Sequence, residues 1–468
     1  MQRGEILKEE RLKHLLALKN QGVDPYPAQV QRDQTVAEAL SRIGQSVAVA
    51  GRVIAIRSHG KAIFLDLVDE SGKIQVYLKA DDLGDRFGQL SQLDEGDFLA
   101  AQGEVFTTKL GETTVHARNF QILAKTLRPL PSQWHGLKDV EERFRKRYLD
   151  LLLNPEVRQL FNLRVRVMKA LRNVMDSHGF TEVETPTLQP IYGGASARPF
   201  TTHYRAYDTD VFLKIAPELY LKRLLVGGYE KVYEMSRNFR NEGADPTHNP
   251  EFMELEFYAA YWDDERLMTF TEDLIIETLE LVRGKAEIEV GGEVIPVTRP
   301  FDRLTFAELT DGTLSDEVFK KAVKHLRRPT FVLQTPRYLV PLAKGLNDQV
   351  ARSFQFVLAG LELAKAFSEL NDPLDQRRQF DLQAEGRARG DEEAQPLDEE
   401  FLEALEYGMP PAAGFGMGLE RFIALVAGQE SLRQTMYFPF MKPRSKAEPK
   451  SRRSSAKVKP AAKRKGNN

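Results

Sequence analysis

The chain has 468 residues, of which 42% are hydrophobic and 29% are charged, and its formal net charge is −2. This length accommodates roughly three domains, each large enough for a core, and the composition is typical of a globular protein. The absence of cysteine excludes disulfide bonds and thiolate metal sites. Because the sequence has no segment typical of a signal peptide or of a bilayer-spanning helix, we expect a cytoplasmic protein with no membrane partner.

The small net charge hides a basic tail at residues 442–468. These residues include eleven Lys or Arg and one Glu, a charge of +10, so the rest of the chain carries −12. The tail is rich in Pro, Ser, Ala and Lys and has no periodic apolar face, which predicts disorder. Two interpretations remain open: an arm that attracts RNA by charge, or a solubilising extension without a partner.

Residues 1–45 predict a helical extension. Apolar residues recur among Lys, Glu and Arg over residues 5–20, which indicates an amphipathic helix. Thr35 is the expected N-cap of a short second helix.

Residues 46–127 change to short strands separated by turns that contain glycine. Five short strands with one longer excursion are typical of an OB-type Greek-key barrel, and the Pro-containing residues 128–141 predict a stiff linker after it. The expected strands cover residues 47–53, 62–67, 73–78, 97–106 and 113–123.

Barrels of this type bind single-stranded nucleic acid by stacking bases on aromatic rings in a basic groove. Phe64 is the candidate stacking ring, although the residue type alone favours a position in the core for a phenylalanine. Gln75 and Glu112 are candidate hydrogen-bonding groups for the bases. The candidate phosphate contacts are Arg57, Lys61 and Lys109.

Residues 142–441 alternate between helices and strands. We expect helices over residues 143–153 and 157–178, then a strand over 181–185 that ends at Pro186. A further helix follows Pro217. Strands over residues 231–235 and 252–257 flank a loop at 241–246, and residues 354–371 carry both strand and helix signals.

The stretch RNFRNEGADPTHNPEFMELEFY at residues 237–258 collects groups that a nucleotide site needs. Arg240 offers a cation for a phosphate, Glu242 a carboxylate for an amine or a metal, and Phe252 a flat apolar surface for a base. We expect Arg240 and Glu242 on one sheet face, because side chains two apart on a strand point the same way. The alternative is an exposed, charged hairpin without a function.

Three motifs in order resemble those of class II aminoacyl-tRNA synthetases. GFTEVETP at residues 179–186 resembles motif 1, FRNEG and HNPEF within residues 239–252 resemble motif 2, and GFGMGLER at 414–421 resembles motif 3. The likeness covers most of residues 1–442, and Glu-Phe-Tyr at 256–258 is similar to the lysyl members. It implies an α+β protein in which an OB-fold anticodon-binding domain precedes a catalytic domain whose antiparallel sheet is flanked by helices. The same resemblance favours a strand pair at residues 354–371. The glycines at residues 414–418 themselves predict a turn that enters a helix over 419–426.

This resemblance implies ATP-dependent ligation of L-lysine to tRNA(Lys) through a lysyl-adenylate, with Mg²⁺ as cofactor. It also implies a homodimer in which the motif 1 helix and strand pack across a two-fold axis. In the barrel, Phe64, Gln75 and Glu112 would read uridines of the anticodon.

For the amino acid, the resemblance places Gly194 and Glu218 at the α-ammonium group and Glu369, helped by Glu256 and Tyr258, at the ε-ammonium group. A buried ammonium needs a negative partner, so a diamine needs one at each end. From the residues alone, Glu218 is equally a carboxylate in the first turn of a helix.

For the nucleotide, Arg240 would bridge the substrate carboxylate and the α-phosphate, and Arg421 would stack on adenine opposite Phe252 and contact the γ-phosphate. Glu362 would bind Mg²⁺ through hard oxygen ligands. The expected catalytic residues are Arg240, Glu242 and Arg421, and the expected ATP-binding residues are Arg240, Glu242, His248, Asn249, Phe252, Glu362 and Arg421.

The sequence departs from the family at three places. Gln355 stands where a second metal-binding glutamate is usual, and Lys365 stands where an asparagine faces the substrate carboxylate. Residues 311–344 are shorter than the usual insertion. These departures leave two alternatives open: a paralogue that acts on another amino acid or on a protein lysine, and a catalytically weakened RNA-binding regulator.

Overall fold

The computed structural model describes residues 3–131, 137–243, 245, 248–391 and 393–444. The chain divides into two compact units, residues 1–136 and 137–468. The predicted basic tail lies outside the described residues from position 445 onward. Among the helices of the described part, none is long and apolar enough to cross a bilayer.

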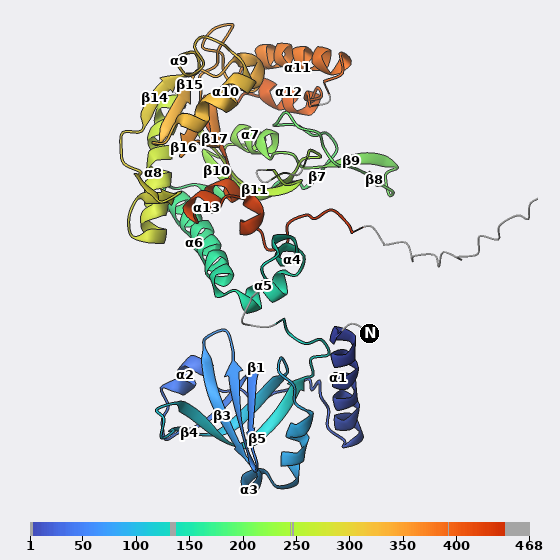
Figure 1. Cartoon of the computed structure of the whole chain (residues 1–468). Coiled ribbons are helices and arrows are strands. Elements are labelled where there is room, and N and C mark those ends of the chain that lie inside the picture. Colours follow the sequence, from blue (N-terminus) through green and yellow to red (C-terminus); the bar gives the residue numbers. More distant parts are fainter. Residues whose placement is uncertain (1–2, 132–136, 244, 246–247, 392, 445–468) are drawn as a thin grey trace, which may run out of the picture. The chain divides into compact units, whose positions relative to one another are not determined.

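The first unit is a closed five-stranded barrel with the strand order β1-β2-β3-β5-β4 (Figure 1). Thr35 caps α2 through a capping box with Glu38, as the sequence predicts. The elements of this unit are α1 (Arg3–Asn20), α2 (Val36–Leu40), β1 (Ser46–His59), β2 (Ala62–Val68), β3 (Lys73–Lys79), α3 (Ala80–Leu83), the 3-10 helix η1 (Gly84–Gln92), β4 (Phe98–Thr107) and β5 (Thr113–Ala124).

Alternation along the barrel strands separates core from surface. In β2 every second side chain is buried, so that Ile63, Leu65 and Leu67 belong to the core and Phe64 lies on the outer row. Phe64 therefore does not occupy the core position that its residue type alone favours.

The second unit is built on an eight-stranded sheet with the order β14-β15-β16-β17-β18-β11-β10-β6. The inner pairs are antiparallel, which confirms the predicted fold class, and the outermost pairs β14–β15 and β10–β6 are parallel. Its strands are β6 (Thr181–Glu182), β10 (Lys231–Phe239), β11 (Glu251–Ala260), β14 (Asp302–Thr305), β15 (Thr330–Leu333), β16 (Ser353–Leu358), β17 (Leu361–Ser368) and β18 (Ala412–Gly418).

Helices and two small sheets surround the large one (Figure 1). The helices are α4 (Val140–Arg145), α5 (Arg147–Leu153), α6 (Pro155–Ser177), α7 (Glu218–Val226), α8 (Asp264–Arg283), α9 (Phe306–Leu309), α10 (Asp316–Ala322), α11 (Pro373–Ala388), α12 (Glu399–Glu406) and α13 (Leu419–Val426), with 3-10 helices η2 (Val323–His325), η3 (Arg337–Leu339) and η4 (Leu432–Thr435). The small sheets contain β7 (Leu188–Gln189), β8 (Thr201–Tyr204), β9 (Thr209–Leu213), β12 (Glu287–Val290) and β13 (Glu293–Pro296).

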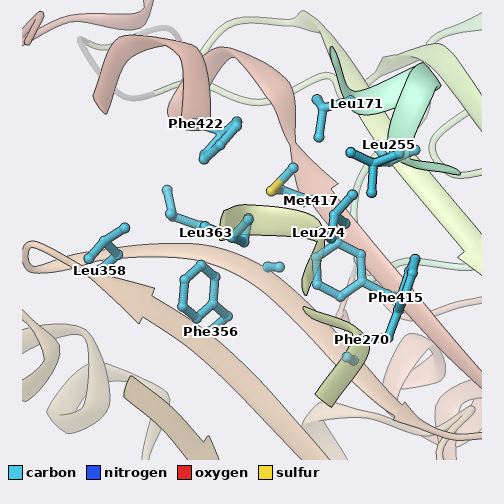
Figure 2. Close-up of a cluster of buried hydrophobic side chains, with 14 of the residues drawn as sticks. Leu171, Leu255, Phe270, Leu274, Phe356, Leu358, Leu363, Phe415, Met417 and Phe422 are labelled. Carbon is cyan, nitrogen blue, oxygen red and sulfur yellow. The ribbon is translucent and has the colours of Figure 1, made fainter. Parts of the chain in front are cut away.

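One face of the large sheet packs on α6, α8 and α13 to form the main hydrophobic core (Figure 2). The strands contribute every second residue to this core. In β11 these are Leu255 and Phe257, and in β18 they are Phe415 and Met417. The residues between them therefore point to the opposite face of the sheet.

Motif 3 differs from the sequence-based expectation. Residues 414–418, expected to form a turn, belong to β18, which lies between β17 and β11. A Cβ atom on Gly414 would lie 2.3 Å from atoms of both Tyr258 and Glu369. The glycine is therefore required by close packing on the neighbouring strand rather than by a turn.

Two other expectations also need correction. The helix expected over 143–153 is interrupted at Lys146, because buried Arg147 donates hydrogen bonds to the backbone carbonyls of Arg433, Met436 and Tyr437. In addition, β10 ends at Phe239, so Arg240 and Glu242 lie in the following loop and not on a strand face.

Candidate functional site

A cavity of about 600 Å³ lies on the sheet face opposite the main core, a volume typical of small-molecule sites. Glu254 and Glu256, which alternate with core residues in β11, contribute to its floor, as do Gly414, Gly416 and Gly418 of β18. The predicted site residues that line this cavity are Gly194, Glu218, Arg240, Glu242, His248, Asn249, Phe252, Glu256, Tyr258, Glu362, Lys365 and Arg421. Two predicted residues, Gln355 and Glu369, do not line it.

One end of the cavity is acidic, and behind its wall lies a buried lysine that the sequence motifs do not indicate. Lys222 of α7 is fully buried, and its Nζ donates to Glu218 Oε1 at 2.6 Å and forms an ion pair with Glu369. The same Nζ lies 5.9 Å from the ring centre of Tyr258 and 5.5 Å from that of Phe367. Glu218 and Lys222 are four residues apart on a helix, a spacing that would have indicated the pair.

These contacts form an environment that suits an ammonium group. Glu369 lies behind the cavity wall against Gly414 and Tyr258, and Tyr258 donates its hydroxyl hydrogen to Glu256 Oε1 at 2.6 Å. Carboxylates on two sides and aromatic rings nearby are a favourable environment for a cation.

Burial shifts the titration of this acidic end. It raises the pKa of Glu369 to about 8, against the opposing effect of Lys222, and it raises the pKa of Glu218. The pKa of Glu256 is raised well above its ordinary value by burial and by Glu254 and Glu218. Burial alone would lower the pKa of Lys222, but Glu218 and Glu369 raise it. The pocket therefore retains protons on carboxyl groups near neutral pH when no cationic ligand is bound.

Gly194 brings its backbone against the start of α7. Its φ is +85°, and a Cβ atom there would lie 2.9 Å from Cβ of Glu218 and 3.1 Å from Cβ of Ala216. Its N–H donates to Oε1 of the buried Gln395 at 3.0 Å. Gln395 also lines the cavity, and it had no local sequence signal because its contact spans 201 residues of chain.

Arg240 lies in the cavity beside Phe252, where its guanidinium carbon is 4.9 Å from the ring centre. One Nη donates to the backbone carbonyl of Ile215 at 3.5 Å, and Glu254 is 4.0 Å away. Its Nε is buried and has no hydrogen-bond partner within the described part of the chain. Such an unsatisfied donor on a cation is the kind of group that an anionic ligand completes.

Arg421, from the first turn of α13, reaches the cavity from the motif 3 side. It donates to the backbone carbonyl of Glu362 at 3.2 Å and lies 3.5 Å from Nε2 of His248. The helix is anchored by the buried Glu420, which accepts from Met253 N at 2.8 Å and from Arg164 at 3.0 Å. Motifs 2 and 3 are therefore held together by a hydrogen bond through Glu420.

The end of the cavity near Glu362 is cationic. Lys365 Nζ lies 3.6 Å from Oε1 of Glu362, and Lys320 of α10 lines the cavity with them. Gln355 lies beneath this region and is 3% exposed. Its Nε2 donates to Thr335 Oγ1 at 3.5 Å, and its Oε1 has no hydrogen-bond partner among the described residues.

The donor atoms at this end fit magnesium only in part. Mg²⁺ is commonly held by one or two carboxylates together with substrate phosphates, and Glu362 is the carboxylate beside Lys365 on this part of the cavity wall. Among the residues that the structure describes, no three His, Cys, Asp or Glu side chains form a metal-binding group. The site therefore suits a metal ion that one protein carboxylate and a phosphate ligand share.

The barrel presents a second candidate site on its outer surface. The rings of Phe64 and Tyr77, which are paired across β2 and β3, are 4.9 Å apart, and His116 is 5.1 Å from Tyr77. Arg57 is paired with Phe64 across β1 and β2, and it forms a bidentate ion pair with Asp66.

Two predicted reading groups lie at the end of this aromatic row. Gln75 Oε1 accepts from Thr114 Oγ1 at 3.0 Å, which leaves its amide N–H₂ as the donor end. Glu112 is exposed in the turn between β4 and β5. Half-buried rings on the outer face, flanked by polar groups, form a stacking surface for unpaired bases.

Comparisons with known proteins agree with this architecture. The family described as tRNA synthetases class II (D, K and N) matches residues 139–442, and the OB-fold nucleic acid binding domain family matches residues 47–123. The fold and the cavity are therefore those of a class II tRNA synthetase.

Curated relatives define the family more closely. A lysine–tRNA ligase from Syntrophomonas wolfei is 45% identical, with 94% of this chain and 97% of that protein covered. One from Moorella thermoacetica is 46% identical over 93% of this chain and 97% of that protein, and one from Aquifex aeolicus is 44% identical over 86% and 74%. The chain belongs to the lysine–tRNA ligase family of class II tRNA synthetases.

Proposed function

We propose that this chain activates L-lysine with ATP and transfers the lysyl group to tRNA(Lys). Family membership supports the activity. The observation that carries the site assignment is Arg240, a cation with an unsatisfied buried donor, in the same cavity as the buried carboxyl groups and the cationic group around Glu362. Such an arrangement suits two ligands bound side by side, a cationic amino acid at the acidic end and an anionic nucleotide at the cationic end.

The charge of the acidic end matches a diamine. When all are ionised, Glu218, Glu256 and Glu369 carry three negative charges and Lys222 carries one positive charge, which leaves two negative charges. The two ammonium groups of lysine neutralise this remainder, and a neutral amino acid side chain would leave buried charge uncompensated. In our assignment Gly194 and Glu218 bind the α-ammonium group, and Glu256, Tyr258 and Glu369 serve the ε-ammonium group.

The first chemical step needs no general base, because a carboxylate is already a nucleophile at neutral pH. Its obstacle is the repulsion between the lysine carboxylate and the α-phosphate. Arg240 contacts both anions in our assignment, so it removes the repulsion and aligns the attacking oxygen with the phosphorus. Pyrophosphate leaves, and a lysyl-adenylate remains in the cavity.

The other end of the cavity orients ATP. In our assignment Phe252 and Arg421 stack on adenine, and Arg421 also contacts the γ-phosphate. Glu242, His248 and Asn249 line the same cavity and are assigned to ATP. Family membership implies Mg²⁺. We assign its binding to Glu362, where the ion would neutralise phosphate charge. Gln355 is buried beneath the cavity wall, and only the oxygen of its side-chain amide could contribute to binding the ion.

In the second step the terminal ribose hydroxyl of the tRNA attacks the adenylate. We assign recognition of the anticodon to the outer face of the barrel, with Phe64 as the stacking ring, Gln75 and Glu112 as hydrogen-bonding groups and Arg57 as a phosphate contact. We also assign the protein to the cytoplasm, where translation takes place, and cell fractionation tests that assignment.

Lysine-dependent exchange of pyrophosphate into ATP tests the function and separates the alternatives. Strong exchange with lysine supports the lysine–tRNA ligase, exchange only with another amino acid would indicate a paralogue, and no exchange would indicate a regulator. Arg240→Ala is expected to reduce the exchange rate by about a hundred- to a thousandfold, because one preorganised donor to the reacting anions is lost.

The matched control for this variant is Arg237→Ala. Arg237 lies on β10 and is 53% exposed in an ion pair with Glu251 outside the cavity, so its loss should leave exchange unchanged. Binding of tRNA should be normal in both variants. Retained exchange in Arg240→Ala would remove Arg240 from its assigned role.

Lysine binding is expected to release protons. Because the pKa of Glu369 is raised to about 8 in the unliganded pocket, a bound ammonium lowers it and displaces the proton. The affinity for lysine should therefore rise with pH up to about 8, by as much as about tenfold per pH unit for each proton released. Calorimetry at pH 7 in two buffers of different ionisation enthalpy measures this release, and equal heats in both buffers would contradict it.

Phe64→Ala is expected to impair tRNA charging while lysine-dependent exchange stays normal. Loss of one base-stacking ring costs about 1–3 kcal/mol, so charging efficiency should fall by roughly ten- to a hundredfold. Phe98→Ala serves as the control, because Phe98 lies on β4 beneath Arg52, away from the aromatic row. Normal charging by Phe64→Ala would reject the anticodon assignment.

We further propose that the protein is a homodimer. Within the described residues β6, the motif 1 strand, is the last strand of the large sheet and is paired only with β10, so one of its edges is available to a partner. Light scattering coupled to size-exclusion chromatography should give twice the mass of one chain, and a monomeric mass at micromolar concentration would disprove the dimer.

A further inference from the structure

The phosphate end of the cavity contains more positive charge than a site that relies on metal ions requires. Arg421, Lys320 and Lys365 line it around the single carboxylate of Glu362. Lys365 is 52% exposed, and its ion pair with Glu362 is long, at 3.6 Å, so its ammonium group retains donors for a ligand. These side chains come from three separate elements, α10, β17 and α13.

Lys320 reaches this end from the short segment at residues 311–344. Its Nζ pairs with Asp316 at 2.7 Å, and 67% of the side chain is exposed. The hydrogen bond to Asp316 raises the pKa of Lys320, as does Glu362, while Arg421 opposes the increase. Lys320 is therefore a charged group close enough to Glu362 and Arg421 to respond to both.

Gln355 explains why the ammonium group of Lys365 has no partner carboxylate other than Glu362 within the described residues. Gln355 and Lys365 face each other across β16 and β17, so both side chains lie on one face of the sheet. A carboxylate at position 355 would be buried and would bind Lys365 or a metal ion. The neutral amide does neither, and Lys365 remains available to the cavity.

The result is a change in the sign of the local field. Two carboxylates would repel a triphosphate until metal ions neutralised them. Glu362 and Lys365 together carry no net charge, as do Lys320 and its partner Asp316, and Arg421 adds a positive charge. A phosphate anion is attracted to such a group of cations without a metal ion between them.

We propose that Lys365, assisted by Lys320, binds the β- and γ-phosphates of ATP directly and so reduces the free Mg²⁺ that this chain needs for ATP binding. This inference rests on the proposed function, because it concerns the ATP site of the same cavity. It assigns Lys365 to the nucleotide rather than to the amino acid. The role is binding and charge neutralisation, and it forms no covalent bond.

The test is the affinity of the full chain for ATP, measured by calorimetry without lysine, at millimolar Mg²⁺ and in EDTA. The unmodified chain should retain binding in EDTA within about tenfold of its affinity with Mg²⁺. Lys365→Asn should lose about tenfold or more in EDTA but little at millimolar Mg²⁺, because one charge-assisted contact to phosphate is removed. The double variant Gln355→Glu with Lys365→Asn should bind ATP only when Mg²⁺ is present.

Lys321→Asn is the matched control. Lys321 lies on the same helix as Lys320, is 73% exposed and pairs with Glu317 away from the cavity, so this variant changes the net charge equally and should bind ATP as the unmodified chain does. Thermal unfolding of each variant confirms that it is folded.

Two outcomes overturn the inference. One is complete loss of ATP binding by the unmodified chain in EDTA, and the other is an identical Mg²⁺ dependence for that chain and folded Lys365→Asn. Failure of the proposed function gives a different result: lysine would not stimulate pyrophosphate exchange at saturating Mg²⁺, whatever the ATP titrations show.

Discussion

The alternation of side chains along two adjacent strands is the constraint on which the rest of this structure depends. On β11 and β18, odd-numbered residues such as Leu255 and Phe415 enter the hydrophobic core, and even-numbered residues such as Glu256 and Gly414 form the floor of the cavity. A shift of one residue in register would place carboxylates in the core and phenylalanines in the cavity. The same strands therefore provide the stability of the domain and the chemistry of its site.

Charge changes sign along the cavity. At one end Lys222 pairs with the buried Glu218 and Glu369, at the other Lys320, Lys365 and Arg421 lie around Glu362, and Arg240 lines the same cavity. The acidic end selects a cationic amino acid because a ligand without matching charge leaves desolvated carboxylates unpaired. The cationic end attracts a triphosphate. Together the two ends place the carboxylate of the amino acid and the α-phosphate near the same guanidinium group, where their mutual repulsion is offset.

Sequence patterns were most informative where the physical cause was local. The helix cap at Thr35, the barrel strands and the two strands that flank motif 2 depend on hydrogen bonds and side-chain periods within a few residues. Sequence patterns gave the wrong structure where a contact with a distant part of the chain decided the outcome. Glycines at residues 414–418 indicated a turn, but the packing of Tyr258 against Gly414 accommodates them in a central strand, and carbonyls almost three hundred residues away interrupt the helix before Arg147.

By itself, the sequence determined the class of fold, the order of the two domains and twelve of the residues that line the cavity, because the motif residues have the same chemical groups in any tertiary context. Only the tertiary structure decided which of these residues share a space. It placed Lys222 between Glu218 and Glu369, moved Gln355 beneath the cavity wall and brought Lys320 to Glu362. Burial and the proximity of charges across strands and helices set these relations, and neither quantity is encoded in local spacing.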